Sequence, residues 1–167
     1  MTATTRHQER TALMGMAIFI GSWTMLFAAL FFGYGLSRLR AHVWPPADLP
    51  PLPLLLPGLA TLVLAGSSAV LHVGRVRLTA LLGVAFLLLQ AIVWRQMLLA
   101  GLRPQSGAYA SYFFALTVFH ALHVLLGLGA FGWLVLRPRP LSLRLWTIYW
   151  HMVGVIWTVM FLLVYVL

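Results

Sequence analysis

The sequence contains neither cysteine nor lysine, and its only acidic residues are Glu9 and Asp48. The absence of cysteine excludes disulfides, thiolate metal ligands and cysteine nucleophiles. Two isolated acids offer no carboxylate pair, and no Ser–His–Asp order or mixed-ligand metal cluster is visible. We therefore expect the chain not to be an enzyme on its own, and to bind no metal.

Charged residues make up only 8% of the 167 residues, whereas 62% are hydrophobic. A soluble domain normally carries about a quarter charged residues, so this composition indicates an integral membrane protein. All basic residues are arginines, and they lie between apolar segments. Their net charge of +9 is therefore better explained by membrane topology and anionic lipid headgroups than by a nucleic-acid partner.

Five apolar stretches are long enough to cross a bilayer, which needs about 20 residues. They cover about residues 12–36, 54–73, 78–99, 109–136 and 145–167. The polar start is short and the first stretch exceeds a signal-peptide core, so we expect that stretch to be retained. A proline-rich connector (44–53) follows it, and Arg137, Pro138, Arg139, Pro140 and Arg144 form a basic turn before the last stretch. The predicted fold is all-α: a polytopic membrane protein forming one five-transmembrane-helix bundle over residues 1–167.

The arginines are divided unequally between the two ends of such a bundle. With the N-terminus inside, seven would lie on the inner side: Arg6, Arg10, Arg75, Arg77, Arg137, Arg139 and Arg144. Four would lie on the outer side: Arg38, Arg40, Arg95 and Arg103. The positive-inside rule then predicts a cytoplasmic N-terminus and a C-terminus on the outer side.

The fourth stretch carries two histidines, His120 and His123, whose spacing places them on one helix face. A buried imidazole needs a polar partner, so this face should point into protein. Either the histidines hydrogen-bond between helices, or they ligate haem or a metal. Counting residues puts His151 of the fifth stretch at the same depth as His123. We expect these two to share a polar pocket with Thr117, a water or a lipid headgroup; alternatively, each bonds a local carbonyl.

Six motifs occur in order along the chain: IFIGSWTMLFAALFFGY (18–34), WPP (44–46), SS (67–68), LGVAFLLLQA (82–91), TVFHALHVLLG (117–127) and YWHMVGVIWTVMFLLVYVL (149–167). Together they resemble subunit III of haem–copper cytochrome c oxidases over nearly the whole chain, and the length fits the shorter, five-helix form. The resemblance implies a non-catalytic accessory subunit that packs against the catalytic subunit of a respiratory oxidase. That partner would hold the haem and copper, and phospholipid would surround both in the inner membrane of a bacterium.

The chain departs from the family pattern at its intramembrane acids. Trp23 and Val93 replace glutamates, and Gly154 replaces an aspartate. None of these side chains exchanges a proton, so the family's carboxylates cannot act here. Two alternatives remain open: a related subunit of a quinol oxidase or nitric oxide reductase, and a b-haem-binding subunit with His123 and His151 as axial ligands.

Overall fold

The computed structural model describes residues 3–137 and 140–167, and the secondary-structure elements in these residues are helices. Its helices are α1 (Ala3–Arg40), α2 (Leu55–His72), α3 (Val76–Leu99), α4 (Ala108–Leu136) and α5 (Pro140–Phe161), followed by a π-helical turn η1 (Leu162–Val166). Within these described residues, five segments are long and apolar enough to cross a membrane: His7–Arg40, Leu55–His72, Val76–Leu99, Ala108–Leu136 and Pro140–Val166. The described residues contain no strand. The predicted all-α fold with five transmembrane helices is confirmed.

Helix α5 begins at Pro140, five residues earlier than expected. Proline suits the first helical position because its missing N–H would have no partner there. Pro140 and Arg144 are therefore helical, and that part of the expected turn was wrong; Pro138 and Arg139 lie outside the described residues. Helix α1 likewise begins well before residue 12, because charged residues end an apolar stretch without ending a helix.

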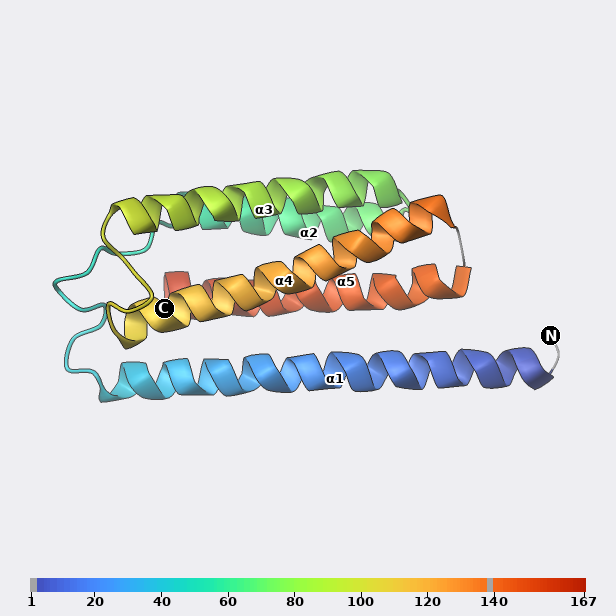
Figure 1. The fold of residues 1–167 in the computed structure, drawn as a ribbon, viewed down its shortest axis with the longest axis horizontal. Coiled ribbons are helices and arrows are strands. Elements are labelled where there is room, and N and C mark those ends of the chain that lie inside the picture. The colour runs from blue at the N-terminus through green and yellow to red at the C-terminus, as the bar shows by residue number, and fades with distance from the viewer. Residues whose placement is uncertain (1–2, 138–139) are drawn as a thin grey trace.

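The helices run alternately up and down, so the two termini lie at opposite ends of the bundle (Figure 1). Helix α2 packs against α3 and α5, α4 contacts both α3 and α5, and α1 lies along α4 and α5. Half of the most apolar window of α4 is buried, compared with 6% for α1. Helix α4 is therefore the centre of the bundle and α1 its peripheral member.

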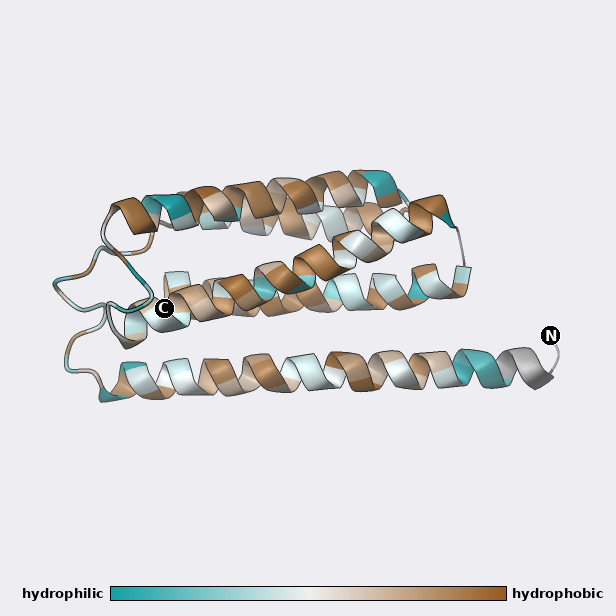
Figure 2. Cartoon of the chain, in the orientation of Figure 1, coloured by the Kyte–Doolittle hydropathy of each residue, from teal (hydrophilic) through white to brown (hydrophobic). Residues whose placement is uncertain are grey.

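Hydrophobic residues occur along all of the helices (Figure 2), and many of the large ones are exposed on the outside of the bundle. On α1 alone, Met14, Ile18, Met25 and Phe32 are exposed. In water such a surface would cause aggregation, whereas in a bilayer it contacts lipid or another apolar subunit. This exterior supports membrane insertion independently of the sequence pattern.

The indole of Trp150 packs into a gap that two glycines leave in neighbouring helices. An added Cβ on Gly83 of α3 would lie 2.9 Å from this ring, and one on Gly127 of α4 would lie 2.8 Å from it. The indole N–H donates to the Ser67 hydroxyl of α2 at 3.0 Å. One side chain of α5 therefore contacts three other helices, which fixes α5 in the bundle.

Candidate functional site

His120 lies on the inner face of α4 with only 1% of its surface exposed. Aromatic rings surround it: the ring centroids of Phe27, Phe86 and Trp157 lie 6.3, 5.6 and 5.1 Å from its own. Neither ring nitrogen has a hydrogen-bond partner among the described residues. His120 is thus a buried polar group in an aromatic environment, which is costly without a partner.

His123 lies one turn further along α4 and makes a local hydrogen bond. Its Nδ1 is 2.5 Å from the carbonyl oxygen of Phe119. A carbonyl can only accept, so we assign the proton to Nδ1, which leaves Nε2 as an acceptor. Nε2 is buried and unpartnered within the described part of the chain. The hydroxyl of Tyr149 donates to the His123 carbonyl at 3.0 Å and ties α5 to this turn.

Trp23 of α1 packs against His123 and lines the same cavity as both histidines. Its ring stands edge-on to that of His123, with the centroids 3.8 Å apart. Both histidines, Trp23 and Tyr149 line a cavity of about 10 Å³ between α1, α4 and α5. A cavity of this size holds at most about one water molecule. Neither a haem nor a phospholipid fits there.

Thr117 has a different role from the histidines beside it. Its hydroxyl accepts from the Trp94 indole N–H at 2.9 Å and donates to the Phe113 carbonyl at 2.7 Å. Thr117 therefore links α3 to α4. It does not line the cavity at the histidines.

His151 is not brought together with His120 and His123. It faces His72 of α2, with ring centroids 5.7 Å apart, and lines a separate cavity of about 380 Å³. The pocket expected for His123 and His151 is therefore corrected to two cavities. The physical reason is rotation about the helix: Tyr149 faces α4, and a residue two positions later points to nearly the opposite side. Counting residues estimated depth and ignored this rotation.

The three positions at which the family pattern has acids lie in three different environments. Trp23 contacts His123, Val93 is fully buried in α3, and Gly154 lines the cavity beside His151. A Cβ on Gly154 would approach the Ser68 hydroxyl to 3.3 Å, so α2 and α5 pack closely here. No carboxylate takes the place of the missing acids, because Glu9 and Asp48 are the only two in the sequence.

Sequence reasoning missed the hydrogen bonds that tryptophans inside the spans make to hydroxyl groups of other helices. Besides the Trp94 and Trp150 bonds, the Trp157 N–H donates to the Thr61 hydroxyl at 2.9 Å. It also missed Gln90, whose amide is fully buried beside the Tyr165 hydroxyl. A usable signal existed, since an indole N–H within a membrane span needs an acceptor and hydroxyls were present in the facing spans.

The described residues contain no group of three or more His, Cys, Asp or Glu side chains that could hold a metal ion. Three hydroxyl groups inside the spans, those of Thr61, Ser67 and Thr117, instead accept indole N–H bonds from other helices. The chain is thus a polytopic helical membrane protein whose buried polar residues form links between helices and a histidine pair.

Its relatives specify the family. The chain is 32% identical over 178 residues to cytochrome c oxidase subunit 3 of Synechocystis sp., covering 93% of this chain and 75% of the relative. It is 32% identical over 179 residues to the subunit of the same name from Thermostichus vulcanus, covering 93% and 87%. A probable cytochrome c oxidase subunit 3 of Mycobacterium tuberculosis is 32% identical over 177 residues, covering 91% and 86%. No protein-family model matches the chain.

The chain belongs to the cytochrome c oxidase subunit 3 family. The resemblance found in the sequence motifs is therefore confirmed. As a member of this family, the chain is a multi-pass membrane component of a respiratory oxidase.

Proposed function

We propose that the chain is a non-catalytic, structural subunit of a haem–copper terminal oxidase, and that it packs against and stabilises the catalytic subunit I. The observation that carries the proposal is the match to subunit 3 over 93% of the chain. In this assignment the partner holds the haem and copper, and this chain holds no redox centre.

The side-chain chemistry of the chain supports this assignment. It has no cysteine, and both of its acids lie outside the bundle interior: Glu9 pairs with Arg144 at one end, and Asp48 lies in the loop at the other. Membrane proton transfer usually relies on Asp, Glu or His residues within the spans. Here only histidines remain, and we propose that His120, His123 and Thr117 form a structural polar layer, with His151 in a separate one.

We further propose that the chain resides in the inner membrane of a bacterium with its N-terminus cytoplasmic. The seven-to-four division of arginines supports this orientation. Phospholipid would contact the apolar exterior wherever subunit I does not.

There are two alternatives to this function: a different partner complex, and binding of a b-type haem by the chain itself. The same fold could serve a quinol oxidase or a nitric oxide reductase complex. A b-haem role has less support, because its candidate ligands His123 and His151 line different cavities.

The decisive experiment is isolation of the affinity-tagged chain from its native membrane in mild detergent. We expect mass spectrometry to find a haem–copper subunit I at equal stoichiometry, and cytochrome c to be oxidised by the complex. Quinol oxidation or nitric oxide reduction by the isolated complex would instead select one of the related complexes. The chain separated from its partner should show no Soret band. Stoichiometric iron in the separated chain would overturn the proposal.

A further inference from the structure

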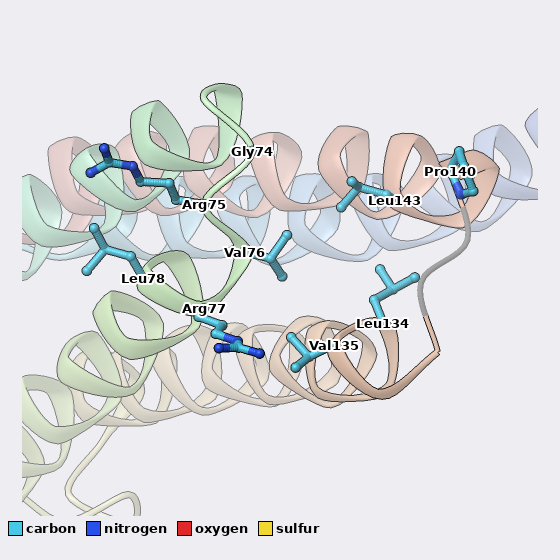
Figure 3. A pocket seen from close by; sticks show the side chains of 9 residues that line it. All are labelled: Gly74, Arg75, Val76, Arg77, Leu78, Leu134, Val135, Pro140 and Leu143. Carbon is cyan, nitrogen blue, oxygen red and sulfur yellow. The ribbon is translucent and has the colours of Figure 1, made fainter.

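A large cavity lies at the end of the bundle near the N-terminus, between the α2–α3 turn and the ends of α4 and α5. Its volume is about 680 Å³, within the range of ligand sites. The α2–α3 turn forms one side of it, and the adjoining ends of α4 and α5 form the other (Figure 3). The lining consists of Gly74, Arg75, Val76, Arg77, Leu78, Leu134, Val135, Pro140 and Leu143.

The positive charge at this cavity has no carboxylate to neutralise it. The chain has two acids: Glu9 pairs with Arg144 at 2.9 Å, and Asp48 follows α1 at the opposite end of the bundle. Arg75 and Arg77 are exposed, and they are the charged residues among the described residues that line the cavity. In this view the Arg77 side chain extends toward Val135, whereas Arg75 extends to the other side of the start of α3 (Figure 3).

The backbone adds donors at the same place. Helix α3 starts at Val76 without a side-chain cap and without an acid in its first turn. The Val76 N–H donates to the Gly74 carbonyl at 3.0 Å, so the N–H groups of Arg77 and Leu78 are the donors left without a backbone acceptor in the described part of the chain. An anion at this position would meet a guanidinium together with the positive end of a helix. These features favour an anionic group such as a phosphate.

The remaining lining favours a lipid over a free ion. Val76, Leu134 and Leu143 form an apolar wall, and Leu78 and Val135 extend it to the exposed exterior of the bundle. Inorganic phosphate would leave this wall in contact with water, whereas an acyl chain would cover it. The arginines stand at the end of a membrane span, which is the depth of headgroups.

We propose that this cavity binds one anionic phospholipid, with the phosphate on Arg77 and the start of α3 and an acyl chain along Leu78, Leu134 and Leu143. Arg75 contributes a second, more distant charge. The inference rests on membrane insertion of the bundle, and it is independent of which oxidase the chain serves.

The test uses the full-length chain in the complex isolated from its membrane, reconstituted into nanodiscs of phosphatidylcholine with added phosphatidylglycerol. Native mass spectrometry counts retained phosphatidylglycerol. We expect Arg77→Gln to lower its retention at least about fivefold, Arg75→Gln to lower it less, and Arg77→Lys to keep most of it. The matched control is Arg103→Gln, an exposed arginine in the α3–α4 loop, which should retain the lipid.

A second variant tests the cavity without changing charge. Val135→Trp places a large ring in the mouth and should also reduce retention of phosphatidylglycerol. Loss in Arg77→Gln without loss in Val135→Trp would mean diffuse surface attraction and would overturn the proposal. Displacement of the lipid by millimolar inorganic phosphate, with equal binding of glycerol phosphate, would assign the site to a free anion and also overturn it.

Folding and assembly are followed separately. Each variant is checked for its unfolding temperature and for recovery of its partner subunit. Retention of phosphatidylglycerol unchanged in every correctly folded variant would refute the lipid site, whatever the partner. An unexpected partner with normal lipid retention would refute the proposed function alone.

Discussion

At the scale of single residues, the indole N–H groups of three tryptophans make hydrogen bonds that link one helix to another. The Trp94 N–H lies in a membrane span, where water cannot replace a lost acceptor. Its acceptor Thr117 is fully buried and itself bonds a backbone carbonyl of α4. This makes Thr117 a better test of the polar layer than either histidine.

We predict that Thr117→Val lowers the free energy of unfolding by about 0.5–2 kcal/mol, because the Trp94 N–H loses its acceptor while side-chain volume is kept. Thr117→Ser should be close to wild type. The measurement is thermal or denaturant unfolding in detergent. A double-mutant cycle with Trp94→Phe should show coupling between the two positions. Additive effects in that cycle would mean that the hydrogen bond contributes nothing.

The histidines show which properties of a single residue could be predicted from the sequence and which could not. The spacing of His120 and His123 predicted a face that points into protein, and both are buried. Their surroundings could not be predicted, because Trp23, Phe27 and Trp157 come from helices distant in sequence. For His151 the predicted direction was wrong, because it faces His72 and not His123, and direction depends on the rotation of α5 against its neighbours.

At the scale of helices, the close approach of α4 and α5 depends on a missing side chain. Gly127 faces the six-membered ring of Trp150, and a Cβ there would lie 2.8 Å from two of its atoms. Trp150 is fully buried and also held by Ser67, so its ring has little freedom to move. The two helices would have to separate to admit a methyl group.

We predict that Gly127→Ala destabilises the bundle by about 1–3 kcal/mol through overpacking, despite the better helix propensity of alanine. Gly129→Ala is the matched control on the same helix, because a Cβ there meets nothing within 4 Å. Its unfolding temperature should be unchanged or slightly higher. Equal effects of the two substitutions on unfolding in detergent would show that Trp150 does not limit this contact.

Helix number was easier to predict than helix limits. Each apolar run was long enough to be recognised without knowledge of its neighbours. The predicted helix ends were wrong where a charged residue was taken to end a helix. Helix α1 continues through Arg38 and Arg40, and α5 includes Arg144. Arginine is a good helix former and can reach the headgroups from within a helix, so its position marks the membrane surface and not the end of the helix.

For the molecule as a whole, the arrangement of the helices makes a prediction about sidedness. The N-terminal end of α1 and the α2–α3 turn lie at one end of the bundle, and the α3–α4 loop lies at the other (Figure 1). Exposed positions are available at each: Gln8 and Val73 at the first end, and Gln105 at the second. The chain has no cysteine, so one introduced cysteine is the only thiol that a reagent can meet in it.

We predict that cysteines at Gln8 and Val73 are protected from a membrane-impermeant maleimide in intact cells, and that a cysteine at Gln105 is labelled. The physical basis is the greater number of arginines at the first end, which disfavours its translocation. Permeabilised cells provide the control, since all three positions should then react. The reverse pattern would keep the fold and overturn the orientation. Labelling of Gln8 and Val73 from different sides would contradict the fold itself, because an even number of spans separates any two positions that share a side.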